Sequence, residues 1–147
     1  MLFRSFTDSL EAAVAESECV LFAVPSSAFR SVATQAKRLI KCDTLLLSAT
    51  KGLENTTGFR MTQILDEIFP AHRASVAALS GPNLAIEIAQ GVPAGAVVAS
   101  TASSTAIAVQ QLFKGIECPL FRVYTSRDVI GVELGGAIKN IDRKSVV

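Results

Sequence analysis

Short apolar runs without a polar interruption recur along this chain, and they limit its fold more than any other feature. Residues 19–24 are all apolar, and Pro25 ends the run. A strand in which apolar and polar residues do not alternate is typical of a sheet covered on both faces, as parallel sheets are. Similar runs predict further strands at residues 44–48, 75–79 and 94–100, and a fifth strand is expected at residues 120–124.

The segments between these runs have the composition or the spacing of helices. Residues 10–16 are rich in helix formers and follow a capping-box-like start at Asp8 and Glu11. Ser26 and Ser27 can cap the next helix, in which apolar residues repeat at helical spacing up to Ile40. Strands that alternate with helices predict an α/β fold with a mainly parallel sheet. The remaining helices are expected at residues 61–68, 84–90, 104–114 and 128–141, the last with Ile130, Leu134, Ala137 and Ile141 on one face.

Composition and charge exclude several classes of protein. Half of the residues are hydrophobic and the net charge is +1, with no basic block that could neutralise a nucleic acid. Three cysteines without CxxC spacing indicate neither a disulfide framework nor a metal site. No apolar run approaches the ~18 residues of a membrane span, and no signal peptide is visible, so we expect a cytoplasmic protein. The single histidine, His72, is expected in a surface turn without a role.

In α/β sheets, ligands bind beyond the carboxyl ends of the strands. Three loops follow predicted strands and contain small or polar residues. These loops are Pro25-Ser26, Thr50-Lys51-Gly52 and the segment 80–83. We therefore expect a binding site where these loops meet.

These loops and the final helix resemble those of NAD(P)-dependent glycerol-3-phosphate dehydrogenases. The resemblance is carried by FAVPS at 22–26, ATKGLE at 49–54, LSGPNLA at 79–85 and GVELGGAIKN at 131–140, and it extends from about Ser5 to Ile141. It implies a Rossmann-type cofactor domain that precedes a helical substrate domain. It also implies an oxidoreductase that interconverts sn-glycerol 3-phosphate and dihydroxyacetone phosphate with NAD or NADP, supplying glycerophospholipid synthesis.

The resemblance assigns the chemistry to two lysines. Reduction of a ketone by hydride leaves an alkoxide, which needs a proton donor within hydrogen-bond reach. The resemblance implies that Lys139 is this catalytic acid, and that Lys51 contacts both substrate and cofactor. Burial or a neighbouring cation can lower the pKa of a lysine toward neutrality. Without the resemblance, both would read as solvated surface lysines.

The other site residues are also implied by the resemblance. Gly81, Asn83 and Asn140 are expected to contact the substrate, and Pro25 and Ala85 to lie against the cofactor. Each has a simpler explanation, since Gly-Pro-Asn is common in turns and an asparagine can end a helix. The glycines of the final helix are expected to pack closely against a backbone or the cofactor, which offsets their helix-destabilising effect.

Two parts of such an enzyme are absent from this sequence. No glycine-rich GxGxxG loop precedes residue 19, so the first βαβ unit is expected to be missing. The resemblance ends at Ile141, and residues 142–147 are expected to be a foreign or frameshifted tail. Residues 1–141 are then a partial cofactor domain whose last helix leads toward the substrate domain. A homodimer stays open for the full-length protein.

Two other functions stay open at this level. One is a related Rossmann dehydrogenase acting on a hydroxy acid, against which the loops Thr50-Lys51-Gly52 and 80–83 argue. The other is a truncated α/β module without catalysis.

The missing pyrophosphate loop leads to a direct prediction. We expect the 147-residue chain alone to be inactive and to bind NAD(P)H weakly or not at all, because helix N-termini and glycine loops hold the pyrophosphate in this fold. A fluorescence titration of NADH and NADPH with the purified chain measures this. Tight saturable binding would contradict the prediction.

Overall fold

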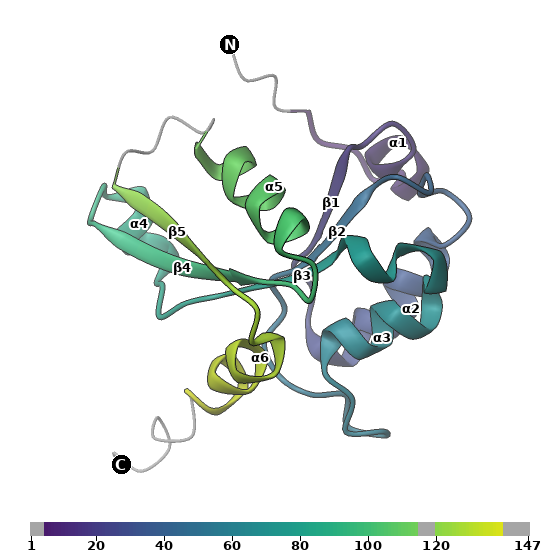
Figure 1. The fold of residues 1–147 in the computed structure, drawn as a ribbon. Coiled ribbons are helices and arrows are strands. Elements are labelled where there is room, and N and C mark those ends of the chain that lie inside the picture. Colours follow the sequence, from purple (N-terminus) through teal and green to yellow (C-terminus); the bar gives the residue numbers. More distant parts are fainter. Residues whose placement is uncertain (1–4, 115–119, 140–147) are drawn as a thin grey trace.

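The computed structural model describes residues 5–114 and 120–139, and these residues form an α/β fold of one sheet with helices on both faces (Figure 1). The expected fold class is confirmed. The strands are β1 (Cys19–Phe22), β2 (Leu45–Ser48), β3 (Val76–Ser80), β4 (Ala94–Ala99) and β5 (Phe121–Ser126). The helices are α1 (Leu10–Val14), α2 (Ser26–Ala36), α3 (Met61–Ile68), the 3-10 helix η1 (Pro70–Ser75), α4 (Ala85–Ala89), α5 (Ser103–Lys114) and α6 (Val129–Ile138).

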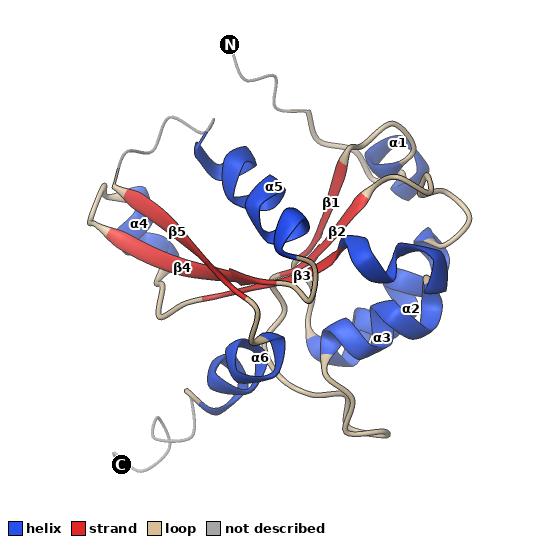
Figure 2. Ribbon diagram, in the orientation of Figure 1, coloured by secondary structure: helices blue, strands red, loops and turns tan. Residues whose placement is uncertain are grey.

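The strands of the described residues lie in the order β1-β2-β3-β4-β5 (Figure 2). The pairings β1–β2, β2–β3 and β4–β5 are parallel, whereas β3 and β4 are antiparallel. The sheet is therefore mainly parallel, as expected. Because β1, β2 and β3 run the same way, the loops that follow them emerge at one edge of the sheet.

Two separate cores cover the two faces of the sheet. The core on one face joins β1, β2 and the start of β3 to α1, α2 and α3, with Phe29 and Leu46 fully buried. The core on the other face joins β2, β3 and β4 to α5, with Val98 and Val109 fully buried. Neighbouring residues of β2 point to opposite faces, so Leu46 belongs to the first core and Leu47 to the second. Burial on both sides explains why the predicted strands are continuously apolar.

Coverage is incomplete at β1, which with β5 forms one of the two edges of the sheet in the part of the chain that the structure describes. Val20 and Phe22 face α2 and are buried, but Leu21 on the opposite face is 48% exposed. On that face α5 packs on β3, β4 and β5. An exposed apolar side chain on a strand with a free edge favours self-association.

The structure corrects two helix starts predicted from the sequence. Helix α1 is capped by Ser9, whose hydroxyl accepts the Ala12 N–H at 3.2 Å, and not by an Asp8–Glu11 box. Helix α2 begins directly at Ser26 after Pro25, so neither serine acts as a side-chain cap there.

The predicted environment of His72 is also wrong. This histidine lies in η1 and is buried, with its Nε2 atom 2.7 Å from the Lys41 carbonyl oxygen. Its ring packs edge-on against Phe69. Helix η1 folds back onto α3, which brings a sequence typical of a surface turn into the interior.

The buried face of α6 differs from the apolar face that spacing predicts. Glu133 and Gly136 are buried, whereas Ile130 is 55% exposed. The physical reason is a close approach to β3, which only a glycine permits, combined with a polar contact that Glu133 makes with α3. Ile141, expected on the same face, lies outside the described residues, as do Cys118 and the tail at 142–147.

No helix within residues 5–114 and 120–139 has both the length and the apolar character needed to cross a membrane.

The first core predicts a large difference between two phenylalanines. Phe29 is fully buried and its ring lies 5.5 Å from that of Phe22, whereas Phe6 is 98% exposed. Phe29→Ala leaves a cavity and is expected to lower the free energy of unfolding by about 3–5 kcal/mol. Phe6→Ala is the matched control and should leave it unchanged. Urea unfolding followed by circular dichroism compares the two, and equal effects would contradict the assignment of this core.

Candidate active site

The loops after β1, β2 and β3 meet at the carboxyl edge of the sheet, as the sequence predicts. The register pairs Phe22 with Ser48, and Ser48 with Ala78, so β1 and β2 end at the same level and β3 runs two residues further, to Ser80. The Thr50 hydroxyl donates to the Val24 carbonyl oxygen at 2.7 Å and thereby joins the first two loops. Gly52 has a φ of 115°, a backbone conformation that favours glycine.

Lys51 links the second loop to the third. Its Nζ atom donates to the Gly81 carbonyl oxygen at 2.9 Å. Gly81 is pressed against β4, because a Cβ atom at this position would lie 2.6 Å from the Gly95 carbonyl oxygen and 2.8 Å from the Asn83 amide nitrogen. The glycine is therefore required by the packing of its own loop, whether or not a ligand also approaches it.

Helix α6 brings Lys139 to the same edge. A Cβ atom on Gly136 would lie 2.5 Å from the Ser80 hydroxyl oxygen and 3.7 Å from Cγ of Lys51, so α6 passes close to the side chains of Ser80 and Lys51 at this glycine. Lys139 follows one turn later at the C-terminal end of the helix. Of the three helical glycines, Gly136 lies close to another element of the fold, through the Ser80 side chain and not through a backbone, and Gly135 has open space around it.

Lys139 affects the protonation of Lys51. Burial, together with the neighbouring Lys139 ammonium, lowers the pKa of Lys51 to about 8. Within residues 5–114 and 120–139, neither lysine forms an ion pair with a carboxylate. Two cations held together without a counter-ion repel each other, and an anionic or partly negative ligand between them would relieve that repulsion.

A shallow cavity of about 240 Å³ lies beside Lys139. Its walls are mostly apolar or backbone, and it opens between the end of β3 and α6. Gly135 adds to the opening, since nothing lies within 4 Å of the place its Cβ atom would occupy. The lining residues are Ser80, Gly81, Pro82, Val97, Gly131, Val132, Gly135, Gly136 and Lys139.

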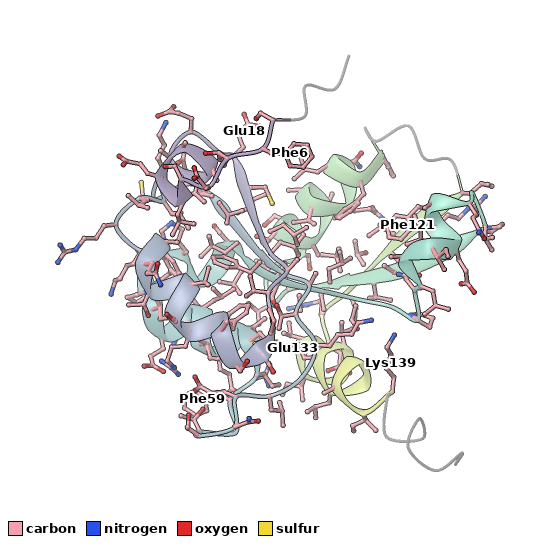
Figure 3. The ribbon with its side chains drawn as sticks, turned by 180° about the vertical axis from the view of Figure 1, so that it is seen from behind. Phe6, Glu18, Phe59, Phe121, Glu133 and Lys139 are labelled. Atoms are coloured by element: carbon pink, nitrogen blue, oxygen red, sulfur yellow. The ribbon has the colours of Figure 1, made fainter. Side chains whose placement is uncertain are left out.

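A buried ion pair fastens α6 to the start of α3. The carboxylate of Glu133 accepts the Thr62 N–H at 2.9 Å, the Thr62 hydroxyl at 2.6 Å and the guanidinium of Arg60. The side chain of Glu133 is 7% exposed and that of Arg60 is 17% exposed. Glu133 therefore supplies the negative charge that the N-terminus of α3 favours, from a residue 71 positions away from Thr62. Figure 3 shows Glu133 on the inner side of α6 and Lys139 at the other end of this helix.

A second ion-pair cluster holds the loop that carries Lys51. Arg30 of α2 contacts Glu54 through two hydrogen bonds of 2.7 and 3.0 Å, and it also reaches Glu67 of α3. Glu54 follows Lys51 by three residues in the same loop. Strong pairing keeps the pKa of the Glu54 carboxyl below its ordinary value, mainly through Arg30 and then through Thr57. Helices α2 and α3 thus hold the outer part of the loop.

The structure brings some of the expected site residues together and leaves others apart. Lys51, Gly81 and Lys139 converge at the edge of the sheet, and Asn83 folds back against Gly81. Pro25 ends the neighbouring loop after β1, and Ala85 is exposed at the start of α4, away from the cavity. Asn140 lies outside the described residues.

The sequence reasoning missed Glu133, Arg60 and Thr62. One signal could have found the first of them. Glu133 is the only charged residue in the segment VIGVELGGAI of α6. A lone charge in an apolar helix is expensive to bury unless it is paired, which points to a partner elsewhere in the fold. Its partners could not be found this way, because they are more than 70 residues distant.

Comparison with known proteins identifies relatives by sequence and by fold. Residues 5–106 match the family described as NAD-dependent glycerol-3-phosphate dehydrogenase N-terminus. The chain is 41% identical to glycerol-3-phosphate dehydrogenase [NAD(P)+] of Syntrophotalea carbinolica over 138 residues, which are 93% of this chain and 40% of the relative. It is 46% identical to the protein of the same name in Frankia casuarinae, again over 138 residues, 94% of this chain and 40% of that one.

A solved structure agrees with these sequence matches. The crystal structure of glycerol-3-phosphate dehydrogenase from Coxiella burnetii superposes with a TM-score of 0.79 at 34% identity, covering 90% of this chain and 39% of that chain. The chain therefore spans about 40% of the length of the curated relatives it matches.

The glycines at the site predict opposite outcomes for the same substitution. Gly81→Ala forces a methyl group against the backbone of β4 and is expected to destabilise the fold by about 1–3 kcal/mol, as overpacking does. Gly135→Ala has open space and should be neutral or stabilising by up to about 1 kcal/mol, because alanine favours a helix. Thermal unfolding of both variants measures the difference. A Gly81→Ala variant as stable as Gly135→Ala would show that the contact with β4 is not tight.

Proposed function

This chain belongs to the NAD-dependent glycerol-3-phosphate dehydrogenase family, and we propose that it contributes the catalytic edge of the cofactor domain in such an enzyme. The reaction is the interconversion of sn-glycerol 3-phosphate and dihydroxyacetone phosphate with NAD or NADP. One observation carries the proposal: Lys51 in the loop after β2 and Lys139 at the end of α6 are 88 residues apart in sequence, yet they lie close enough for Lys139 to lower the pKa of Lys51.

The residues around the cavity fit one flat ring or a three-carbon substrate. A volume of about 240 Å³ is smaller than the pockets of roughly 300–1,000 Å³ that enclose a drug-sized ligand, so it suits part of a dinucleotide and not the whole. Its apolar walls at Pro82, Val97 and Val132 suit the face of a nicotinamide. When bound, the reduced nicotinamide supplies the hydride to the carbonyl carbon of the substrate.

Lys139 acts as the general acid of the reduction. As the carbonyl carbon gains hydride, its oxygen gains negative charge, and the Lys139 ammonium gives that oxygen a proton to form the secondary alcohol. In the oxidation, the neutral amine accepts the same proton from the alcohol. The proton balance therefore needs no other group than the lysine and the solvent that reprotonates it.

Lys51 stabilises charge on the substrate and assists this proton transfer. Its ammonium, fixed by the Gly81 carbonyl oxygen, is a preorganised cation beside the developing alkoxide. A pKa of about 8 means that Lys51 keeps its proton through neutral pH and loses it in mildly alkaline solution. Raising the pH through this range removes positive charge from the site, which weakens binding of a phosphorylated substrate.

The remaining residues bind and orient. Gly81, Asn83 and Asn140 are assigned to substrate contact, with the Asn83 amide able to donate and accept. Pro25 and Ala85 are assigned to cofactor contact. We also propose a cytoplasmic enzyme that supplies glycerophospholipid synthesis and that forms a homodimer when full length.

The proposal is tested in a hybrid enzyme. Residues 5–139 replace the matching segment of the Syntrophotalea carbinolica relative, which supplies the rest of the protein. Lys139→Ala in this hybrid is expected to lower kcat by about 10²–10⁴, the usual contribution of a general acid, while the Kd for NADH changes little. The measurement is NADH or NADPH oxidation with dihydroxyacetone phosphate.

Lys37→Ala is the control, because this exposed lysine follows α2 away from the site. It should keep the kcat of the unmodified hybrid. If Lys139→Ala retains more than about a tenth of the parental kcat, the acid–base role is wrong.

A further inference from the structure

We propose that Glu133 is a positioning residue, which holds α6 in the rotation that brings Lys139 beside Lys51. The importance of the Lys51–Lys139 pair for catalysis rests on the function proposed above. The proximity of the two lysines does not, since it is a property of the protein without substrate.

Glu133 is well placed to control α6. In the part of the chain that the structure describes, Glu133 makes every hydrogen bond from a side chain of α6 to another element. Its carboxylate accepts from a backbone N–H, a hydroxyl and a guanidinium, so both oxygens are engaged and their directions are fixed. A helix held by such a group cannot rotate without breaking all three contacts.

The partners of Glu133 lie at the end of the loop that carries Lys51 and in the first turn of α3, which follows this loop. Arg60 is the residue before α3, and its backbone pairs with Leu53, two residues after Lys51. The far side of this loop is held by Arg30 through Glu54. Through Arg60, Glu133 therefore joins the α6 end of the site to the Lys51 end.

Glu133 is too far from Lys139 along α6 to contact it, so it can influence Lys139 only through the position of the helix. Glu133 and Lys139 are six residues apart, which is roughly 9 Å along a helix axis and about 240° of rotation. Gly136 lies between them, where α6 passes close to the side chains of Ser80 and Lys51. A shift of α6 by one residue would turn Lys139 by about 100°, away from Lys51.

A positioning role of Glu133 and a direct effect of its charge predict opposite changes in the pKa of Lys51 when Glu133 is replaced. If Glu133 acted through its own charge, removing that charge would lower the pKa of Lys51 further, because a nearby anion favours the protonated amine. If it acts by holding Lys139 in place, removing it frees Lys139 and the pKa of Lys51 rises. Burial and the neighbouring Lys139 both lower the pKa of Lys51. Replacing Glu133 tests the contribution of Lys139.

The experiment measures the pKa of Lys51 in the 147-residue chain and in Glu133→Gln. Brief acylation with trace acetic anhydride across pH 6–11, followed by peptide mass spectrometry, yields the titration of each lysine separately. In the parent chain we expect Lys51 to titrate at about 8. In Glu133→Gln we expect the pKa to rise, and a rise by one pH unit would slow acylation of Lys51 at pH 8 about fivefold.

Two variants calibrate the result. Lys139→Met removes the neighbouring cation. It therefore gives the highest pKa that Lys51 can reach by losing Lys139 while it stays buried. Glu67→Gln makes the same acid-to-amide change on α3, where Glu67 contacts Arg30 and not α6, and should leave Lys51 at about 8. Circular dichroism confirms that each variant keeps its helices, which separates a moved lysine from an unfolded chain.

A folded Glu133→Gln variant in which the pKa of Lys51 is unchanged or lower overturns the proposal. If Glu133→Gln unfolds, Glu133→Asp decides, since it keeps the charge but withdraws the carboxylate by one methylene. A folded Glu133→Asp with a raised pKa of Lys51 supports positioning, and an unchanged pKa overturns it. If neither variant folds, Glu133 is purely structural and the proposal is wrong. Failure of the Lys139→Ala test in the hybrid would leave this result unaffected.

Discussion

Burial of the sheet on both faces is the constraint on which the rest of this structure depends. It requires strands that are apolar throughout, and it places polar groups at the strand ends, where the backbone leaves the sheet. The parallel run of β1, β2 and β3 then directs three polar loops to a single edge. A ligand site at that edge follows from the packing of the sheet before any particular chemistry is considered.

The chemistry depends on α6, which is attached by two contacts of different kinds. Gly136 allows the helix to approach β3 closely enough to touch Ser80, and Glu133 holds its rotation through Arg60 and Thr62. A buried carboxylate adds little net stability when it replaces an apolar group, but it is costly to leave without its partners. The ion pair is therefore best understood as a device that selects one orientation of α6 over others of similar energy.

Some residues of the candidate site could be predicted from the sequence and others could not. Lys51 and Gly81 lie in loops that directly follow strands, so the rule for α/β sheets is enough to bring them together. Lys139 lies at the C-terminal end of a helix, and only the resemblance to a family indicated its role before its position was known. Glu133 was missed, because helical spacing selected the apolar face with Ile130, which the structure leaves 55% exposed. Spacing ranks residues by hydropathy, and here the buried face was decided by a close approach and a charge.

The amino-acid sequence by itself determined the local structure and the layered α/β class. Apolar runs, proline stops and helical spacing act over a few residues and are independent of the rest of the chain. Only the tertiary structure decided the antiparallel entry of β4, the burial of His72 and the convergence of Lys51 with Lys139. These features arise from contacts between segments tens of residues apart. Their energies depend on distance and orientation in space, which no local pattern of residues contains.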